Sequence, residues 1–411
     1  MIPDIALISK DETSQAGRSW PRDLILGILP LLVGFEVLFA ITYVPLALRG
    51  TADFRQLYVG GYMVRTGHAR ELYNYDTQQR FEEEVVPVRE RYLLPINHLA
   101  FEEVFFAPMS LLPYRTAYWV FVALNGVLLA ICVWLLKATL HAPEQWKWLP
   151  ALLIASFFPV ARALMEGQDS IILLTLLAAA LWALDHEREF AAGFLVGIGL
   201  FKFQIVIPIM LLFLIWRRWR FSAGFAVSSV AASLASLWLV GLVGAKEYWN
   251  MLLSMSLRLS SSADMLRYCT NPREMINLRG LVTAIFDGKL PHDYVQGLVA
   301  ACSVVVLWMA ARQRPSLPLA IAAASLVSYH FIVHDASVLL IVVAAALCSA
   351  SVWKGAVAGL FLLATLWTVI PAHGYPAAVP LLGLLLLMIE RAPDRSALDF
   401  RDALAEGSTC A

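Results

Sequence analysis

The stretch "AAGFLVGIGLFKFQIVIPIMLLFLIWRRWR" (191–220) decides the fold. It lies in an apolar run (190–216) that is longer than the roughly 20 residues of one membrane helix, and Lys202 lies near its middle. A single crossing would place "RRWR" (217–220) opposite "DHERE" (185–189) and break the positive-inside rule in the loops that follow. Two short helices, 190–201 and 205–216, keep these charges on one side. We therefore predict a hairpin that reverses at Lys202.

The composition points to a membrane protein. Hydrophobic residues make up 60% of the 411 residues and charged residues 15%, and the mean hydropathy is +0.69. A soluble domain has nearer one quarter charged residues. The net charge of zero argues against a nucleic-acid partner. The five cysteines are scattered singly, so we expect no disulfide and no zinc site.

The apolar runs predict an all-α polytopic protein of twelve membrane helices in a single domain (1–411), with both termini cytoplasmic. The first run is too long for a signal peptide and is interpreted as an uncleaved span. The predicted helices are 24–48, 116–136, 149–164, 170–184, 190–201, 205–216, 222–244, 294–311, 317–333, 336–350, 354–371 and 376–390. Two long segments, 49–115 and 245–293, then lie on the outer face. Phe54, Leu57 and Tyr58 recur at helical spacing in the first, which predicts short helices in the membrane interface.

On this topology the unusual polar residues converge on the outer face. Ionisable groups at membrane depth are costly, so by default they are candidates for function. The candidates are Asp53, Arg55, Tyr58, Glu166, Gln168, Asp169, Lys202, His330, His334 and Asp335.

Each candidate also has a structural interpretation, and the residues alone leave both open. Asp53 could cap the helix that starts at Phe54, because aspartate is a favoured N-cap. Lys202 could extend to the headgroups without binding a substrate. Segment 166–169 could be a turn and cap, and His334 with Asp335 could be an orienting pair or a cap. The dipeptide "NH" (97–98) is expected to stabilise its own loop.

Several stretches together resemble glycosyltransferase family 87 (the domain of unknown function 2029 group, which includes polyprenyl-phosphate-mannose-dependent mannosyltransferases) of the GT-C superfamily. After Asp53 the stretches are "GHARELYN" (67–74), "NHLAFEEVFFAPMSLLPYRTAYWVFVALN" (97–125), "EGQDSIILLTL" (166–176), "AAGFLVGIGLFKFQIVIPIMLLFLIWRRWR" (191–220) and "HDASVLLIV" (334–342). The resemblance covers most of residues 24–342 and implies a GT-C-type fold.

The resemblance implies a membrane enzyme of the bacterial plasma (inner) membrane with its active site on the outer, periplasmic face. The enzyme would transfer a hexosyl group, mannosyl first, from a polyprenyl-phosphate sugar to a lipid or glycan acceptor with inversion. A donor of this kind explains why the sequence has no nucleotide-binding motif. No cofactor beyond this donor is implied.

The chemistry of that reaction suggests a role for several candidates. A carboxylate must take the proton of the acceptor hydroxyl, and Asp53 is the expected general base. Cations must stabilise the leaving phosphate, and Lys202, His334 and Arg55 are the expected groups. The remaining candidates are Tyr58, Glu166, Gln168, Asp169, His330 and Asp335, which are assigned to substrate binding, and we expect no metal. A polytopic transporter or lipid flippase is the alternative, because a broken helix with polar residues also fits that class. A membrane scaffold is the third.

Overall fold

The computed structural model describes residues 20–87, 94–140, 147–257, 271–349 and 351–389, and within these ranges all regular structure is helical. The first part of the chain forms α2 (Trp20–Leu46), α3 (Phe54–Arg65), α4 (Tyr75–Val85), α5 (Phe101–Phe106), α6 (Tyr114–Thr139), α7 (Leu149–Ser156), α8 (Phe158–Glu166) and α9 (Ser170–Asp185). The second part forms α10 (Glu189–Ile198), α11 (Phe203–Ile215), α12 (Trp219–Leu257), α14 (Leu278–Phe286), α15 (His292–Ala311), α16 (Leu317–Val327), α17 (Leu340–Cys348), α18 (Val352–Thr365) and α19 (Ala378–Met388).

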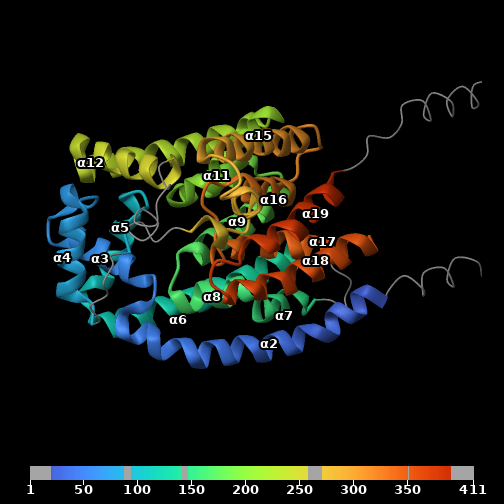
Figure 1. Ribbon diagram of the computed structural model, residues 1–411, viewed down its shortest axis with the longest axis horizontal. Coiled ribbons are helices and arrows are strands. Elements are labelled where there is room, and N and C mark those ends of the chain that lie inside the picture. The colour runs from blue at the N-terminus through green and yellow to red at the C-terminus, as the bar shows by residue number, and fades with distance from the viewer. Residues whose placement is uncertain (1–19, 88–93, 141–146, 258–270, 350, 390–411) are drawn as a thin grey trace, which may run out of the picture.

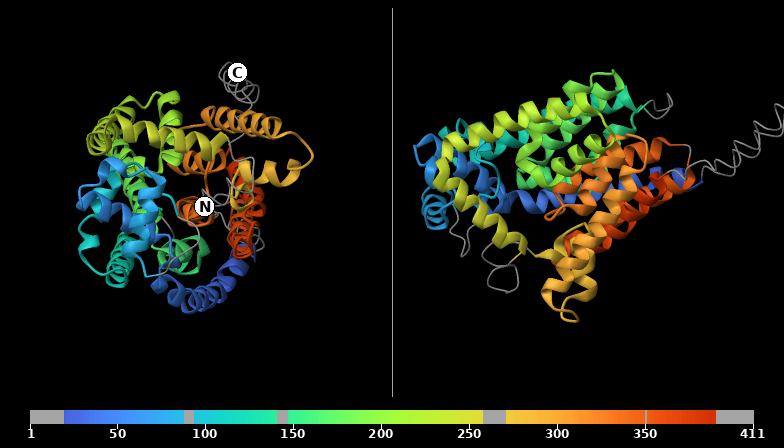
Figure 2. Two further views of the ribbon diagram at one scale, coloured as in Figure 1. Left: turned by 60° about the vertical axis from the view of Figure 1, so that its left-hand side comes forward. Right: turned by 90° about the horizontal axis from the view of Figure 1, so that it is seen from above.

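The other helices surround a central group formed by α9, α16 and α17, whose side chains are mostly buried. In Figure 1, α2 runs along one edge of the molecule and α12 with α15 along the opposite edge, while α3, α4 and α5 gather at one end. Figure 2 shows the same arrangement from two further directions. The larger hydrophobic core includes buried side chains of α9, α16 and α17, such as Leu174, Ile321 and Val342.

The predicted membrane character agrees with the helices, but the predicted number of spans is not confirmed. Six stretches of the described chain are long and apolar enough to cross a membrane, or seven if the bent pair α7 and α8 counts as one span. All twelve predicted apolar segments contain helix. Several of these helices, such as α16, α17 and α19, are shorter than a full crossing requires.

The chain reverses near Lys202, as the charge pattern predicts. By length and composition Glu189–Ile215 passes as one span, but its two ends lie together. Arg218 Nη1 is 3.0 Å from Glu189 Oε1, whereas a straight helix would hold these residues about 40 Å apart. The reversal takes place in a 3-10 turn, η5 (Gly199–Lys202), between α10 and α11.

The hairpin gives the molecule two chemically different ends. Its open end meets the C-termini of α6 and α9 around a cavity of about 880 Å³, whose charged lining residues are Asp185, Glu187, Glu189, Arg218 and Arg220. We call this the basic end, since Arg188, Arg217, Arg312 and Arg314 also lie at helix ends next to these segments. The tip of the hairpin, with Lys202, lies at the other end of α9, α10 and α11.

The first predicted outer segment forms helices, but the expected place of its apolar residues is wrong. Phe54, Leu57 and Tyr58 of α3 are buried in a second hydrophobic core with side chains of α5 and α6. The ring of Phe54 stacks on Phe121 with centroids 5.4 Å apart. These residues therefore hold α3 against α6 instead of facing the membrane interface. In the second predicted outer segment the chain remains helical to Leu257, but α12 is kinked at Gly241 (φ 67°), close to the predicted end of the span at residue 244.

Candidate active site

Asp53 lies in the bend between α2 and α3. The bend contains a π-helical turn (Ala47–Thr51) in which Gly50 has a φ of 98°. Asp53 occupies the N-cap position of α3, but its side chain makes no capping hydrogen bond. Its Oδ2 instead accepts a hydrogen bond from Gln168 Nε2 at 2.7 Å. The carboxylate therefore points away from its own helix and toward the segment that follows α8.

A left-handed glycine brings this segment close to Asp53. Gly167 ends α8 with a φ of 62°, a conformation that glycine adopts without strain. A Cβ at this position would lie 2.8 Å from Cβ of Phe54, the residue next to Asp53. The close approach explains why Glu166 and Gln168 reach Asp53, and it requires glycine for both its φ and its size.

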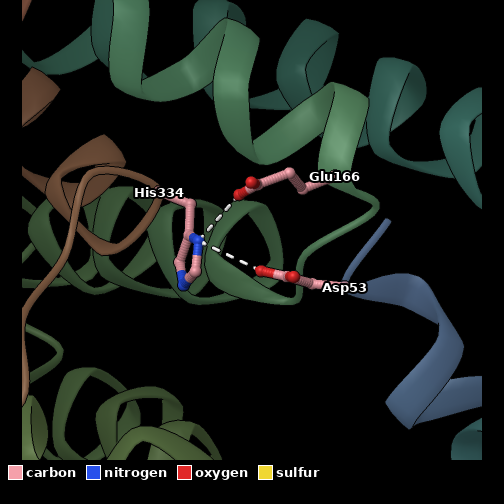
Figure 3. A group of neighbouring side chains, drawn as sticks. All are labelled: Asp53, Glu166 and His334. Atoms are coloured by element: carbon pink, nitrogen blue, oxygen red, sulfur yellow. Dashed lines mark hydrogen bonds and ion pairs between the residues drawn. The ribbon is translucent and has the colours of Figure 1, made fainter. Parts of the chain in front are cut away.

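Asp53, Glu166 and His334 form a group that we call the Asp53 cluster (Figure 3). His334 Nδ1 lies 2.9 Å from Glu166 Oε2 and 3.6 Å from Asp53 Oδ2. Arg162, one turn before Glu166 on α8, binds the other oxygen of that carboxylate through Nε at 2.6 Å. The three side chains come from three separate segments, so only the folded chain assembles them.

The environment of His334 favours a charged imidazole. Burial alone would lower the pKa of His334, but the negative charges of Asp335 and Glu166, together with the Glu166 hydrogen bond, raise it above the usual value. Between these two carboxylates the ring of His334 is therefore more readily protonated than a free imidazole. When protonated, it supplies a positive group next to Asp53.

Lys202 is not the free cation that we expected from the sequence. Its Nζ lies 3.0 Å from Asp169 Oδ1 and 2.9 Å from Asp335 Oδ1, and the side chain is 3% exposed. Two carboxylates outweigh the charge of one ammonium, so this group does not attract a phosphate as a lone lysine would. Lys202 instead ties the hairpin tip to the start of α9 and to η7 (Asp335–Leu339).

A second group, which we call the His98 cluster, consists of His98, Glu102 and Asp169. His98 Nδ1 lies 2.7 Å from Glu102 Oε2 and 3.3 Å from Asp169 Oδ2. All three side chains are at least nine-tenths buried. Burial lowers the pKa of His98 to about 4 against the attraction of Asp169, so its ring is neutral at pH 7. Burial and the repulsion of Asp169 raise the pKa of Glu102 well above its usual range.

Two cavities meet at Asp53 and His334. The wide cavity has a volume of about 380 Å³ and is also lined by Arg55, Arg162, Glu166, Glu274 and an apolar wall at 369–371. The narrow cavity has a volume of about 50 Å³ and is lined by the amides Gln56, Asn97, Gln168 and Gln204 together with His98, Lys202, Tyr329 and His330. Asp53 and His334 line both cavities, so a group bound in either one can reach them.

The structure brings most of the predicted residues together. Glu166, Gln168, Asp169, Lys202, His334 and Asp335 contact one another or Asp53, and His330 lines the narrow cavity. Arg55 lines the wide cavity, where it is 3.8 Å from Glu82 and its Nε has no hydrogen-bond partner among the described residues.

Tyr58 does not fit the predicted role in substrate binding. Its hydroxyl donates a hydrogen bond to the carbonyl oxygen of Leu112 at 2.8 Å, and its ring packs edge-on against Tyr114. With 5% of its surface exposed, the side chain stabilises the second core.

Sequence reasoning missed His98, Glu102 and Arg162. His98 and Glu102 are four residues apart, as are Arg162 and Glu166, and side chains at this spacing meet on one face of a helical turn. The dipeptide "NH" was expected to stabilise its own loop, but His98 contacts Asp169 from a distant part of the chain. The spacing of polar residues was therefore the available signal.

Fold and site together define a polytopic helical membrane protein with a polar centre assembled at the ends of its helices. Comparison with known proteins gives this class a name. The family model of glycosyltransferase family 87 matches residues 101–340. The match covers more than half of the 411 residues, so the chain belongs to glycosyltransferase family 87 and is a membrane glycosyltransferase. This result confirms the resemblance seen in the sequence.

Two curated relatives are similar to part of the chain. Both are named alpha-(1->3)-arabinofuranosyltransferase and come from Mycobacterium tuberculosis, strains CDC 1551 / Oshkosh and ATCC 25618 / H37Rv. Each is 26% identical over 161 residues, which is 35% of this chain and 37% of the relative. The chain thus covers little more than a third of these relatives. No solved structure matches.

Proposed function

We propose that this protein transfers a sugar from a polyprenyl-phosphate donor to a lipid or glycan acceptor, with inversion at C1 and with Asp53 as the general base. The observation that carries the proposal is the orientation of Asp53. Its carboxylate leaves the capping position of α3 free and faces two cavities beside a buried imidazole. In the transition state the acceptor oxygen bonds to C1, the bond from C1 to the phosphate oxygen breaks, and the hydroxyl proton moves to Asp53.

The wide cavity is the proposed place of the donor phosphate. Arg55 and His334 line it, and the buried Nε of Arg55 is available to donate a hydrogen bond. Fixed cations in a water-poor site stabilise the charge that the leaving phosphate gains. Val369 and Ile370 on the same cavity are 48% and 46% exposed and offer an apolar path for the polyprenyl chain. Arg55 therefore replaces Lys202 as the leading partner of the phosphate.

The narrow cavity is the proposed approach of the acceptor hydroxyl. Gln56, Asn97, Gln168 and Gln204 present neutral amides, which can donate hydrogen bonds to hydroxyl groups and accept them. In an inverting reaction the base and the leaving group act on opposite faces of C1. We therefore place the phosphate in the wide cavity and the acceptor in the narrow cavity, which are separate and both border Asp53.

The distribution of charge supports an active site on the outer, periplasmic face of the bacterial inner membrane. Arginines gather at the basic end, and short cytoplasmic loops of membrane proteins are enriched in lysine and arginine. The Asp53 cluster lies at the other ends of α9, α10 and α11. With the basic end in the cytoplasm, the Asp53 cluster faces outward, where polyprenyl-linked donors are available without a nucleotide.

The identity of the sugar has two candidates. The resemblance to polyprenyl-phosphate-mannose-dependent enzymes favours a mannosyl group, and the name of the two relatives favours an arabinofuranosyl group.

The protein reconstituted in vesicles should be given polyprenyl phosphate carrying radiolabelled mannose or arabinofuranose, with a bacterial glycolipid extract as acceptor. We expect one donor to give a labelled product of inverted anomeric configuration and free polyprenyl phosphate. Unchanged donor that crosses the bilayer without forming a product would favour the flippase alternative instead.

A further inference from the structure

We propose that the His98 cluster binds one divalent transition-metal cation, such as Mn²⁺ or Zn²⁺, at a structural site separate from the Asp53 cluster. The ligands would be His98 Nδ1, Glu102 Oε2 and Asp169 Oδ2. The site would tie the segment before α5 to the start of α9. It departs from the expectation of metal independence that we drew from the sequence.

The positions of the three ligand atoms fit a cation. They lie within 4.8 Å of one another, with His98 Nδ1 at 2.7 Å from Glu102 Oε2 and at 3.3 Å from Asp169 Oδ2. Nitrogen and oxygen ligands at about 2.1 Å from a metal are separated from each other by roughly 3.0–3.4 Å in octahedral or tetrahedral sites. A small adjustment of Glu102 would therefore complete this arrangement.

The hydrogen bonds of the two clusters differ, and this difference identifies the His98 cluster as the proposed metal site. Asp53, Glu166 and His334 also lie within 4.8 Å of one another, but Gln168 donates to Asp53 and Arg162 donates to Glu166. The carboxyl groups of Glu102 and Asp169 are hydrogen-bonded to each other and Glu102 Oε2 lies 2.7 Å from His98 Nδ1, but no donor from outside the cluster reaches either oxygen of Glu102 or Oδ2 of Asp169 within the described chain. Buried carboxylate oxygens without such donors need a cation, which can be a metal ion or a proton.

The charge around the His98 cluster also calls for a cation. Glu102 and Asp169 belong to it, Glu103 is fully buried next to it in the chain, and Lys202 already shares its charge with Asp335, so either a proton or a metal ion must balance these carboxyl groups. One imidazole nitrogen with two carboxylate oxygens suits Mn²⁺ or Zn²⁺ better than Mg²⁺ or Ca²⁺, which prefer oxygen ligands alone.

The narrow cavity supplies an entry path and room for water. His98 lines it together with Lys202 and Gln168, so water there can complete the coordination. The bound cation would fix Asp169, which in turn holds Lys202 at the hairpin tip. Its role would be to position this wall of the cavity, without contact to the reacting atoms.

Metal content can be measured without any sugar-transfer assay. The full-length protein in detergent should be stripped with EDTA, incubated with Mn²⁺ or Zn²⁺, desalted and analysed by mass spectrometry for bound metal. We expect about one equivalent per chain in the wild type and at least about tenfold weaker binding in Glu102→Gln and His98→Ala. Glu103→Gln is the matched control, because it changes the neighbouring buried carboxylate, and Asp53→Asn should also keep the metal.

Three outcomes would overturn the proposal. A wild-type protein that retains neither cation would mean that protons neutralise the cluster. Loss of the metal in Asp53→Asn, with retention in Glu102→Gln, would place the site at the Asp53 cluster. If the ligand variants fail to fold, electron spin echo spectra of Mn²⁺ bound to the wild type test the assignment instead. We expect coupling of Mn²⁺ to a histidine nitrogen, and the absence of this coupling would contradict the assignment. Each result is independent of whether the proposed sugar transfer is correct.

Discussion

The Asp53 cluster and the His98 cluster contain the same kinds of groups, two carboxylates and one imidazole, but their surroundings differ. In the Asp53 cluster, Gln168 and Arg162 donate hydrogen bonds to the carboxylates, and Asp53 is 23% exposed on two cavities. In the His98 cluster no side chain is more than 8% exposed, and no donor from outside the cluster reaches the oxygens of Glu102 or Oδ2 of Asp169 within the described chain.

This difference separates two uses of buried charge. A general base must be reachable by substrate and must already be oriented, so its hydrogen bonds leave one side open. A structural group needs no access, and its charge must be balanced within the fold. The Asp53 cluster meets the first requirement and the His98 cluster the second. Lys202 joins the two through Asp169 and Asp335.

The largest expected effect is on stability and comes from the residue that joins the clusters. Lys202→Met would leave Asp169 and Asp335 buried without their shared cation, which typically costs about 3–5 kcal/mol in the free energy of unfolding. Thermal unfolding in detergent should show a much lower midpoint than in the wild type, and exposed Lys246→Met is the control. A Lys202→Met protein with a normal thermal midpoint but weak binding of the donor would mean that Lys202 binds the donor phosphate.

The next effect concerns the imidazole of the Asp53 cluster. His334→Gln removes a positive group beside the proposed phosphate site, and we expect kcat/KM for the donor to fall by about 10²-fold. Steady-state transfer at several donor concentrations measures this. His186→Gln, an exposed histidine at the basic end, should leave transfer unchanged. Equal rates for His334→Gln and the wild type would remove His334 from the reaction.

The raised pKa of His334 predicts a pH dependence of stability. The charged groups around the ring are Glu166 on α8, Asp53 before α3, and Asp335 with Lys202. Because the pKa is higher in the folded state, the stabilisation is fully present below the unfolded value of about 6.5 and is lost as pH rises through the folded value. The thermal midpoint of the wild type, measured relative to His334→Gln, should therefore fall as pH increases. A relative midpoint that rises with pH would contradict the charged state assigned to the ring.

The smallest effect is expected at Tyr58, outside both clusters. Tyr58→Phe removes the hydrogen bond to Leu112, which typically contributes about 1 kcal/mol or less. The thermal midpoint should drop slightly, while KM for donor and acceptor stays at the wild-type value. An increased KM would mean that the hydroxyl binds substrate, as the sequence suggested.

Charge and hydropathy in the sequence were sufficient for the helical class and for the hairpin. The sign of the charges at 185–189 and 217–220 required both segments on one side, and the ion pair of Glu189 with Arg218 agrees. The twelve-span count is not confirmed, because several of the apolar runs form helices that are shorter than a full crossing. The interfacial assignment of Phe54 failed because helical spacing identifies an apolar face without identifying what covers it.

The sequence predicted which residues lie together in the polar centre better than it predicted the role of each residue. Asp53, Glu166, Gln168 and His334 were expected on one face, and they lie together. The two partners of Lys202 could not be deduced, since Asp169 and Asp335 come from distant segments. His98 was missed because the dipeptide Asn97–His98 suggested a loop, whereas the ring of His98 contacts Asp169 from a distant part of the chain.

The most direct test of the account is the transfer rate of Asp53→Asn with the donor that the wild type uses. Asparagine keeps the shape of the side chain and could cap α3 as well as aspartate does, but it cannot accept a proton. We expect transfer to fall by about 10²-fold or more, with an unchanged thermal midpoint, while Asp76→Asn on exposed α4 behaves as the wild type. An Asp53→Asn protein with near-normal turnover would contradict the assignment of Asp53 as the general base and would leave Glu166 as the carboxylate to examine.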